Sequence, residues 1–136
     1  MISHDTQLRV RYGETDQMGF VYYGKYAEYF EVGRVELIRS LGLSYKSIEE
    51  RGIWMPVADF SIKYRQPGRY DDLLTIRTSL QELPRSSFLT SYEVFNEAGD
   101  LLVTGEVRLA FFHAERMVPV RVPDFILEAV SAHWTA

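Results

Sequence analysis

A single helical pattern dominates this sequence and restricts the folds that it can adopt. Between residues 22 and 41, apolar residues recur every three or four positions, which predicts one amphipathic helix. The residues of this stripe are Tyr23, Tyr26, Ala27, Phe30, Gly33, Leu37, Ile38 and Leu41. At 1.5 Å per residue the helix would be about 30 Å long, and Gly42 is well placed to end it. Such a helix needs an apolar surface to pack against.

Strands supply that surface, and the sequence predicts them on both sides of the helix. Segments with alternating or β-branched apolar residues lie at residues 7–12, 57–65, 74–80, 88–95 and 101–112. Short connections at residues 66–68 and 96–100 favour antiparallel neighbours. We therefore expect one α+β domain over residues 1–136, with the sheet packed on the long helix. Two shorter helical segments are expected at residues 44–51 and 125–132.

Composition excludes several functional classes. The chain has 136 residues, which suits one domain with a substantial core. It contains no cysteine, which rules out disulfides, thiolate metal sites and cysteine nucleophiles. The net charge of −4 gives no general affinity for nucleic acid. Because no run of about twenty apolar residues and no signal peptide is found, we expect no stable membrane insertion and, by default, a cytoplasmic location.

The segment between the first strand and the helix carries residues suited to chemistry. Gly13, Thr15, Asp16 and Gly19 are typical of a loop, and this loop leads into the helix N-terminus. The free N–H groups and positive dipole end of a helix start favour a carboxylate or a developing oxyanion. Asp16 is therefore a candidate catalytic group at the helix start. The alternative is a loop residue whose side chain accepts hydrogen bonds from backbone amides, and composition alone leaves both interpretations open.

Two ordered motifs around this loop resemble a known family. The first is Tyr12-x-x-Thr15-Asp16-x-x-Gly19-x-Val21-Tyr22, and the second is Tyr26-x-x-x-Phe30-Glu31-x-x-Arg34-x-Glu36. Residues 67–73 and 120–123 resemble later turns of the same family, so the similarity covers about residues 8–126. The chain resembles the 4-hydroxybenzoyl-CoA thioesterase family of hotdog proteins, in its YbgC-like branch. The resemblance implies a hotdog fold, an antiparallel five-stranded sheet wrapped around one long central helix.

The same resemblance implies an activity, namely hydrolysis of the thioester of an acyl- or aroyl-coenzyme A to the free acid and coenzyme A. Asp16 would be the catalytic carboxylate, as nucleophile or as general base, and the backbone N–H of Tyr23 would polarise the carbonyl. Many YbgC-like members carry histidine where this chain has Tyr23, but the backbone role needs only an N–H. No metal or redox cofactor is implied, because coenzyme A is part of the substrate. The family forms homodimers with active sites at the subunit interface, and dimers often pair into homotetramers.

Seven residues are candidates for substrate binding: Tyr22, Gly19, Arg85, Ser86, Ser87, Lys63 and Arg65. Gly19 and Tyr22 lie between Asp16 and Tyr23, the two residues expected to act on the thioester. Residues 85–87 lie where relatives bind the nucleotide part of coenzyme A, and arginine and hydroxyl groups suit phosphate oxygens. Lys63 and Arg65, on the second predicted strand, are further candidate cations.

Other polar residues have structural interpretations. Glu31 and Arg34 are three positions apart in the helix and are expected to pair on its surface, with Glu31 as a second choice of catalytic carboxylate. His4, His113 and His133 show no metal-binding spacing. Other functions remain open, namely a non-catalytic module that binds acyl-CoA or acyl carrier protein, transacylation, and hydrolysis from a carrier protein. The sequence does not identify the acyl group.

Overall fold

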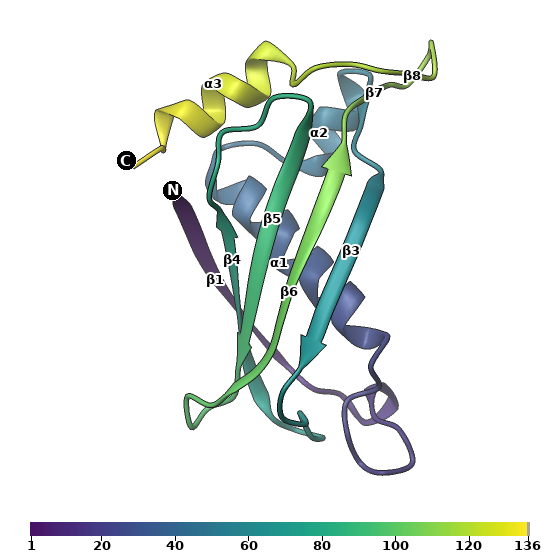
Figure 1. Cartoon of the computed structure of the whole chain (residues 1–136), viewed down its shortest axis with the longest axis vertical. Coiled ribbons are helices and arrows are strands. Elements are labelled where there is room, and N and C mark those ends of the chain that lie inside the picture. The colour runs from purple at the N-terminus through teal and green to yellow at the C-terminus, as the bar shows by residue number, and fades with distance from the viewer. Residues whose placement is uncertain (136) are drawn as a thin grey trace.

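The computed structural model describes residues 1–135, and its main feature is a five-stranded sheet curved around one long helix (Figure 1). The strands are β1 (Ile2–Arg9), β3 (Val57–Tyr64), β4 (Leu73–Leu80), β5 (Ser87–Phe95) and β6 (Leu101–Ala110). Their order across the sheet is β1-β4-β5-β6-β3, and all neighbouring strands are antiparallel. Helix α1 (Lys25–Ser40) crosses one face of the sheet. The predicted α+β arrangement is confirmed.

Smaller elements complete the described chain. Helix α2 (Tyr45–Glu50) follows α1, and helix α3 (Asp124–Ala132) crosses the upper end of the sheet in Figure 1. Both agree with the short helices predicted at residues 44–51 and 125–132. A second sheet contains β2 (Ile53–Trp54), β7 (Phe112–His113) and β8 (Val118–Pro119). The sequence did not predict this sheet, because strands of two residues are too short to show alternation.

Helix α1 packs closely on the sheet because two glycines leave room for it. A Cβ atom on Gly33 would overlap with the Thr78 side chain and would lie 2.9 Å from Ile76 Cγ2, both on β4. A Cβ atom on Gly105 of β6 would lie only 2.5 Å from the ring of Phe30, which is fully buried. Glycine at these two positions therefore sets the distance between helix and sheet, since any larger side chain would push them apart.

The first strand differs from the prediction of residues 7–12. It begins at Ile2, pairs with β4 along its whole length and ends at Arg9. Val10 then leaves the strand ladder, and its N–H donates instead to the Asp72 carbonyl oxygen. Tyr12, expected on the buried face, belongs to a 3-10 turn and is 80% exposed. The residues before position 7 did not predict a strand because edge strands alternate weakly when their outer side is polar.

The long helix begins at Lys25, three residues after its predicted start at position 22. Tyr23 and Ala27 are exposed, although both belonged to the predicted apolar stripe. Tyr29 and Arg34 are buried as well, and they lie on the two sides of the stripe formed by Phe30 and Leu37. At the other strands the predicted ends shift by at most two residues. The strand predicted at residues 101–112, for example, corresponds to β6, which ends at Ala110.

Strand β3 forms an edge of the sheet, with β6 as its only strand neighbour among residues 1–135. Its apolar side chains Val57, Phe60 and Tyr64 are 54%, 43% and 49% exposed. An edge with free main-chain groups and exposed apolar side chains is suited to pairing with another strand.

Candidate active site

The loop before α1 closes into a tight turn around Asp16. The Asp16 N–H donates to the Phe20 carbonyl oxygen at 2.7 Å, and the Gly19 N–H donates to the Asp16 carbonyl oxygen at 2.9 Å. Gly19 has a φ of +80°, a left-handed conformation that other residues adopt only with strain. A further bridge between Thr15 and Val21 joins the two ends of the turn. The loop chemistry read from the sequence is therefore confirmed, and the predicted bend at Gly19 has this cause.

One oxygen of the Asp16 carboxylate is engaged by the loop and the other is free. Oδ1 accepts the N–H of Met18 at 2.9 Å and the N–H of Phe20 at 3.1 Å. No described residue donates a hydrogen bond to Oδ2. Asp16 is half-buried. The loop interpretation is therefore confirmed for Oδ1, and Oδ2 accepts no hydrogen bond from the described residues.

Asp16 and Tyr23 line the same cavity, which has a volume of about 330 Å³. Its other lining residues are Met18, Phe20, Val21, Tyr26, Tyr64, Arg65, Gln66 and Pro67. Most of this surface is apolar, apart from Asp16 and Arg65. Burial raises the pKa of Tyr26 to about 12, so its phenol stays neutral. Such a cavity suits an apolar group attached to a reactive polar bond.

The peptide N–H of Tyr23 is a free donor at this cavity. Among residues 1–135 no backbone or side-chain acceptor receives it, and α1 begins two residues later. The Tyr64 hydroxyl of β3 donates to the Tyr23 carbonyl oxygen at 3.1 Å and so fixes the neighbouring peptide. The helix dipole adds positive potential at this end. The side chain of Tyr22 stacks against the ring of Tyr23, with ring centroids 4.7 Å apart, but Tyr22 does not line the cavity.

Glu14 stabilises the loop through hydrogen bonds, and it was not predicted from the sequence as a residue of the site. Its carboxylate accepts the N–H of Arg11 at 2.7 Å, and its carbonyl oxygen accepts the N–H of Tyr22 at 2.9 Å. Burial alone would raise the pKa of Glu14, but hydrogen bonds from the backbone and side chain of Arg11 lower it overall. Burial and the nearby Glu14 carboxylate together raise the pKa of Tyr29. An ionised, buried Glu14 thus ties both ends of the loop together.

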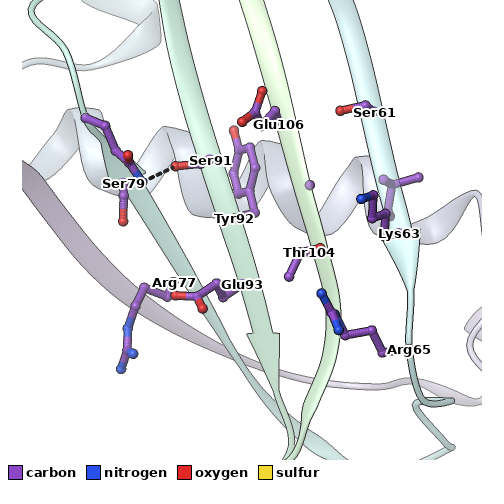
Figure 2. Close-up of a pocket in the computed structure, with 13 residues that line it drawn as sticks. Ser61, Lys63, Arg65, Arg77, Ser79, Ser91, Tyr92, Glu93, Thr104 and Glu106 are labelled. Carbon is purple, nitrogen blue, oxygen red and sulfur yellow. Dashed lines mark hydrogen bonds between the residues drawn. The ribbon is translucent and has the colours of Figure 1, made fainter.

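Arg65 connects the cavity with the outer face of the sheet. It lines the Asp16 cavity and also a hollow of about 470 Å³ on the face opposite α1. Figure 2 shows Lys63 of β3 and Arg65, one residue after its end, at this hollow, with Glu93 on β5 and Arg77 on β4. Of the two predicted cations from residues 57–65, Arg65 therefore lines the same cavity as Asp16, whereas Lys63 lines the hollow on the outer face.

Residues 85–87 lie far from Asp16 within one chain. They line a separate cavity of about 550 Å³ at the turn between β4 and β5, together with Arg108 and Trp134. In Figure 1 this turn is at the upper end of the sheet, while the Asp16 loop is at the lower end. Arg108 Nη1 donates to Ser87 Oγ at 2.6 Å, which holds one hydroxyl of the group. A single chain does not bring these candidates to the Asp16 cavity.

The predicted surface pair of Glu31 and Arg34 is wrong. Arg34 is buried, and it donates to the hydroxyl groups of Tyr45 and Tyr92 instead of pairing with Glu31. The reason is its position four residues after Phe30 and three before Leu37, which places Arg34 within the buried stripe of the helix. Within residues 1–135 no three metal-binding side chains lie together, and no helix has the length and apolar character to cross a membrane. His113 Nδ1 accepts the N–H of Arg116 in a local turn.

A five-stranded antiparallel sheet around one helix, with a carboxylate and a free N–H at the helix start, defines a hotdog domain of the thioesterase type. The family model described as the thioesterase-like superfamily matches residues 10–130. The chain belongs to this superfamily. The family predicted from the two loop and helix motifs is therefore confirmed.

Similar proteins agree on the class of reaction. A DHNA-CoA thioesterase from Staphylococcus aureus is 37% identical, with a TM-score of 0.90 over 97% of this chain and 91% of that one. The acyl-CoA thioester hydrolase YbgC of Escherichia coli O6:H1 is 28% identical over 120 residues, 88% of this chain and 90% of that protein. A 4-hydroxybenzoyl CoA thioesterase mutant, solved with 4-hydroxybenzoyl CoA, is 26% identical, with a TM-score of 0.83 over 93% of this chain and 97% of that one. This chain is a thioester hydrolase.

Proposed function

We propose that this chain hydrolyses the thioester of an acyl-coenzyme A, with Asp16 as the catalytic carboxylate and the Tyr23 N–H as the oxyanion donor. One observation carries the proposal. The free Oδ2 of Asp16 and the unbonded N–H of Tyr23 belong to residues of the same 330 Å³ cavity. The names of the similar proteins support coenzyme A thioesters as the substrate class.

The Tyr23 N–H has the chemistry needed to activate the carbonyl. A thioester oxygen that accepts this hydrogen bond gains negative charge when the carbon is attacked, and the helix dipole favours that charge. The peptide that carries this donor is held by the Lys25 N–H, which donates to the Tyr22 carbonyl oxygen at 2.9 Å, so little reorganisation is needed during the reaction. Removing one such donor typically costs about 10²–10³ in kcat. A backbone donor also explains how the enzyme works without the histidine that many relatives carry at position 23.

Asp16 can act by two routes. As a nucleophile, Oδ2 attacks the carbonyl carbon, the C–S bond breaks, coenzyme A leaves as the thiolate and takes up a proton, and water hydrolyses the mixed anhydride. As a general base, Oδ2 removes a proton from water, whose oxygen attacks the same carbon; the C–S bond then breaks, and the coenzyme A thiolate takes up the proton. Hydroxylamine in a rapid-quench reaction distinguishes them, because only the anhydride route can leave a hydroxamate on Asp16 of the protein, whereas the acyl hydroxamate also forms directly from the thioester.

The test is a hydrolysis panel with matched variants. Free coenzyme A is measured with a thiol reagent, and the absence of cysteine from the chain removes protein background. We expect turnover of some acyl-CoAs, loss of about 10²–10⁴-fold in kcat for Asp16→Asn, and no change for Asp100→Asn in the 96–100 turn. Binding of a non-hydrolysable thioether should survive in Asp16→Asn. Full turnover by this variant would instead support a binding module, and turnover of acyl carrier protein alone would change the substrate.

A homodimer through the β3 edge is part of this proposal. The Arg65 N–H donates into the sheet, to the Leu102 carbonyl oxygen. Because successive residues of a strand point their main-chain groups to opposite sides, those of Phe60, Ile62 and Tyr64, which follow the bulge between Val57 and Asp59, face the free edge. A second copy presents the same edge, and pairing two antiparallel β3 strands would satisfy the free N–H and C=O groups of both edges.

The side chains favour one register for this pair. Side chains of the two strands must share a face, so only registers that oppose residues of equal parity are allowed. Phe60 or Ser61 on the two-fold axis gives the same overlap of two β3 strands, and the side-chain pairs favour Ser61. Lys63 then opposes Asp59 of the partner subunit on the polar outer face, and Phe60 opposes the partner subunit's Ile62 on the inner face. Both pairs are complementary.

The dimer would also explain the positions of the phosphate-binding candidates. Antiparallel pairing at β3 brings the upper end of the partner towards the lower end of this chain. Arg85, Ser86 and Ser87 of the partner subunit would then approach the Asp16 cavity, with Arg65 at its mouth, and bind the phosphates of coenzyme A. Light scattering gives the assembly size, and a homotetramer is the expected larger form.

A further inference from the structure

Arg34 is a buried cation without a buried anion. The residue is 6% exposed, and its Nε and Nη1 donate to the hydroxyl groups of Tyr45 and Tyr92 at 3.0 and 3.1 Å. The Tyr92 hydroxyl is itself shared with Thr90 Oγ1 at 2.6 Å. Among residues 1–135 no carboxylate forms an ion pair with Arg34. Placing a guanidinium in the interior beside neutral groups alone is unfavourable, so its presence requires an explanation.

Arg34 lines a cavity with a free donor. The cavity has a volume of about 310 Å³ and lies between α1 and β3, and its other lining residues are Ala27, Glu28, Glu31, Val57, Phe60 and Val107. No described residue accepts a hydrogen bond from Nη2 of Arg34. The remaining wall is largely apolar, and the exposed carboxylates of Glu28 and Glu31 would repel an anion. These groups suit an apolar body that ends in an uncharged oxygen acceptor.

This cavity is too far from the reacting atoms of its own chain to serve them. Residues 23 and 34 are separated by about 16 Å along the helix, at 1.5 Å per residue. In the proposed dimer, however, Phe60 of one copy opposes Ile62 of the partner subunit, and Tyr64 of the partner subunit is the next residue on the same inner face. Phe60 lines the Arg34 cavity and Tyr64 lines the Asp16 cavity, so the two cavities adjoin across the subunit interface.

We propose that the Arg34 cavity receives the far end of an acyl group whose thioester is bound at Asp16 of the second copy, and that Arg34 selects acyl groups with an uncharged oxygen acceptor there. The inference rests on the proposed function and on the β3 dimer. It assigns Arg34 a specificity role in the other subunit's reaction. Each active site is then incomplete in a single chain.

The first test compares two acyl groups of equal size. The probes are 4-methoxybenzoyl-CoA, which has an ether oxygen acceptor, and 4-ethylbenzoyl-CoA, which lacks it. We expect the wild type to favour the methoxy compound by about 10-fold or more in kcat/KM, as for a hydrogen bond from a charged donor. Arg34→Met should bring the ratio close to one while the ethyl compound is still hydrolysed.

The ratio of the two kcat/KM values is insensitive to partial unfolding, because both substrates are assayed with the same enzyme preparation. Arg34→Lys, which retains a charge, should keep part of the preference. An unchanged ratio in Arg34→Met, or a wild type that hydrolyses both compounds equally, overturns the role of Arg34 alone. A wild type that hydrolyses no acyl-CoA overturns the proposed function.

The second test asks whether the cavity acts across the interface. Asp16→Asn removes the carboxylate, and Val57→Trp fills the Arg34 cavity without changing Arg34. Co-expressed chains form heterodimers in which one site carries both defects and the other carries none. We expect each variant alone to be inactive on 4-methoxybenzoyl-CoA and the mixture to recover about a quarter of wild-type activity, from random pairing. No recovery in a mixture that light scattering shows to be dimeric overturns the inference.

Discussion

Replacing Asp16 by alanine and by asparagine separates its two roles. Alanine removes the acceptor of the Met18 and Phe20 N–H groups, which lie 2.9 and 3.1 Å from Oδ1. Two bonds to a charged acceptor in a half-buried loop contribute about 1–3 kcal/mol in total. Asparagine keeps an oxygen in place and loses only the charge. Neutral bonds are about half as strong, so Asp16→Asn should cost about 1 kcal/mol.

Catalysis should follow the opposite pattern, because the amide of asparagine neither attacks a carbonyl nor accepts a proton from water. Both variants should lose about 10²–10⁴-fold in kcat, although only Asp16→Ala is markedly less stable. Urea unfolding gives the stability from the midpoint at constant m, and kcat is measured where each variant is folded. Activity that falls only in proportion to the unfolded fraction would refute a reacting Oδ2 and leave Asp16 as a loop residue.

Three further perturbations test other parts of the structure. Ser61→Cys, in a chain without cysteine, should form an intersubunit disulfide under mild oxidation, while Phe60→Cys and Ile62→Cys should not. A dimer band on a non-reducing gel for Phe60→Cys or Ile62→Cys, and none for Ser61→Cys, would reject the register. Gly33→Ala should lower the free energy of unfolding by about 1–3 kcal/mol, because its Cβ would lie 2.9 Å from Ile76, and an unchanged urea midpoint would contradict the close packing. The pKa of Glu14 is lowered from 4.5 in the folded protein, so ionised Glu14 stabilises the fold above that value and this contribution is lost as pH falls through the folded pKa. Glu14→Gln should therefore unfold more easily at pH 7 and show a smaller decrease in stability between pH 5 and 3. Parallel pH profiles of stability for the two proteins would refute this role of Glu14.

The sequence predicted the parts of the fold that depend on period. The long apolar stripe located α1, and alternation located the strands of the main sheet to within a few residues, apart from β1, because burial on one face imposes these repeats. The motifs around the loop led to Asp16 and Tyr23, which the structure brings to one cavity. Local hydrogen-bonding residues and a glycine at a left-handed position are visible in a sequence.

What the sequence missed depends on contacts between distant segments. Glu14 is buried because the loop folds over it, and nothing in its neighbours signals that. Arg34 was expected on the surface because charged residues usually are, but it lies four residues after Phe30 on the apolar stripe of α1 and is buried beside Tyr92 of β5. Arg85 was grouped with Asp16, although the sheet separates them within one chain. In the proposed dimer, a second copy would bring them together.

Strand β3 has a mechanical consequence for the whole assembly. The Tyr64 hydroxyl that holds the Tyr23 peptide belongs to the same strand whose outer edge is free to join another copy. If the proposed dimer separates on dilution, that strand would lose its support on one side, and the loosening would reach the peptide next to the proposed oxyanion donor through the 3.1 Å contact of Tyr64. Specific activity should therefore depend on protein concentration even when the folded fraction does not.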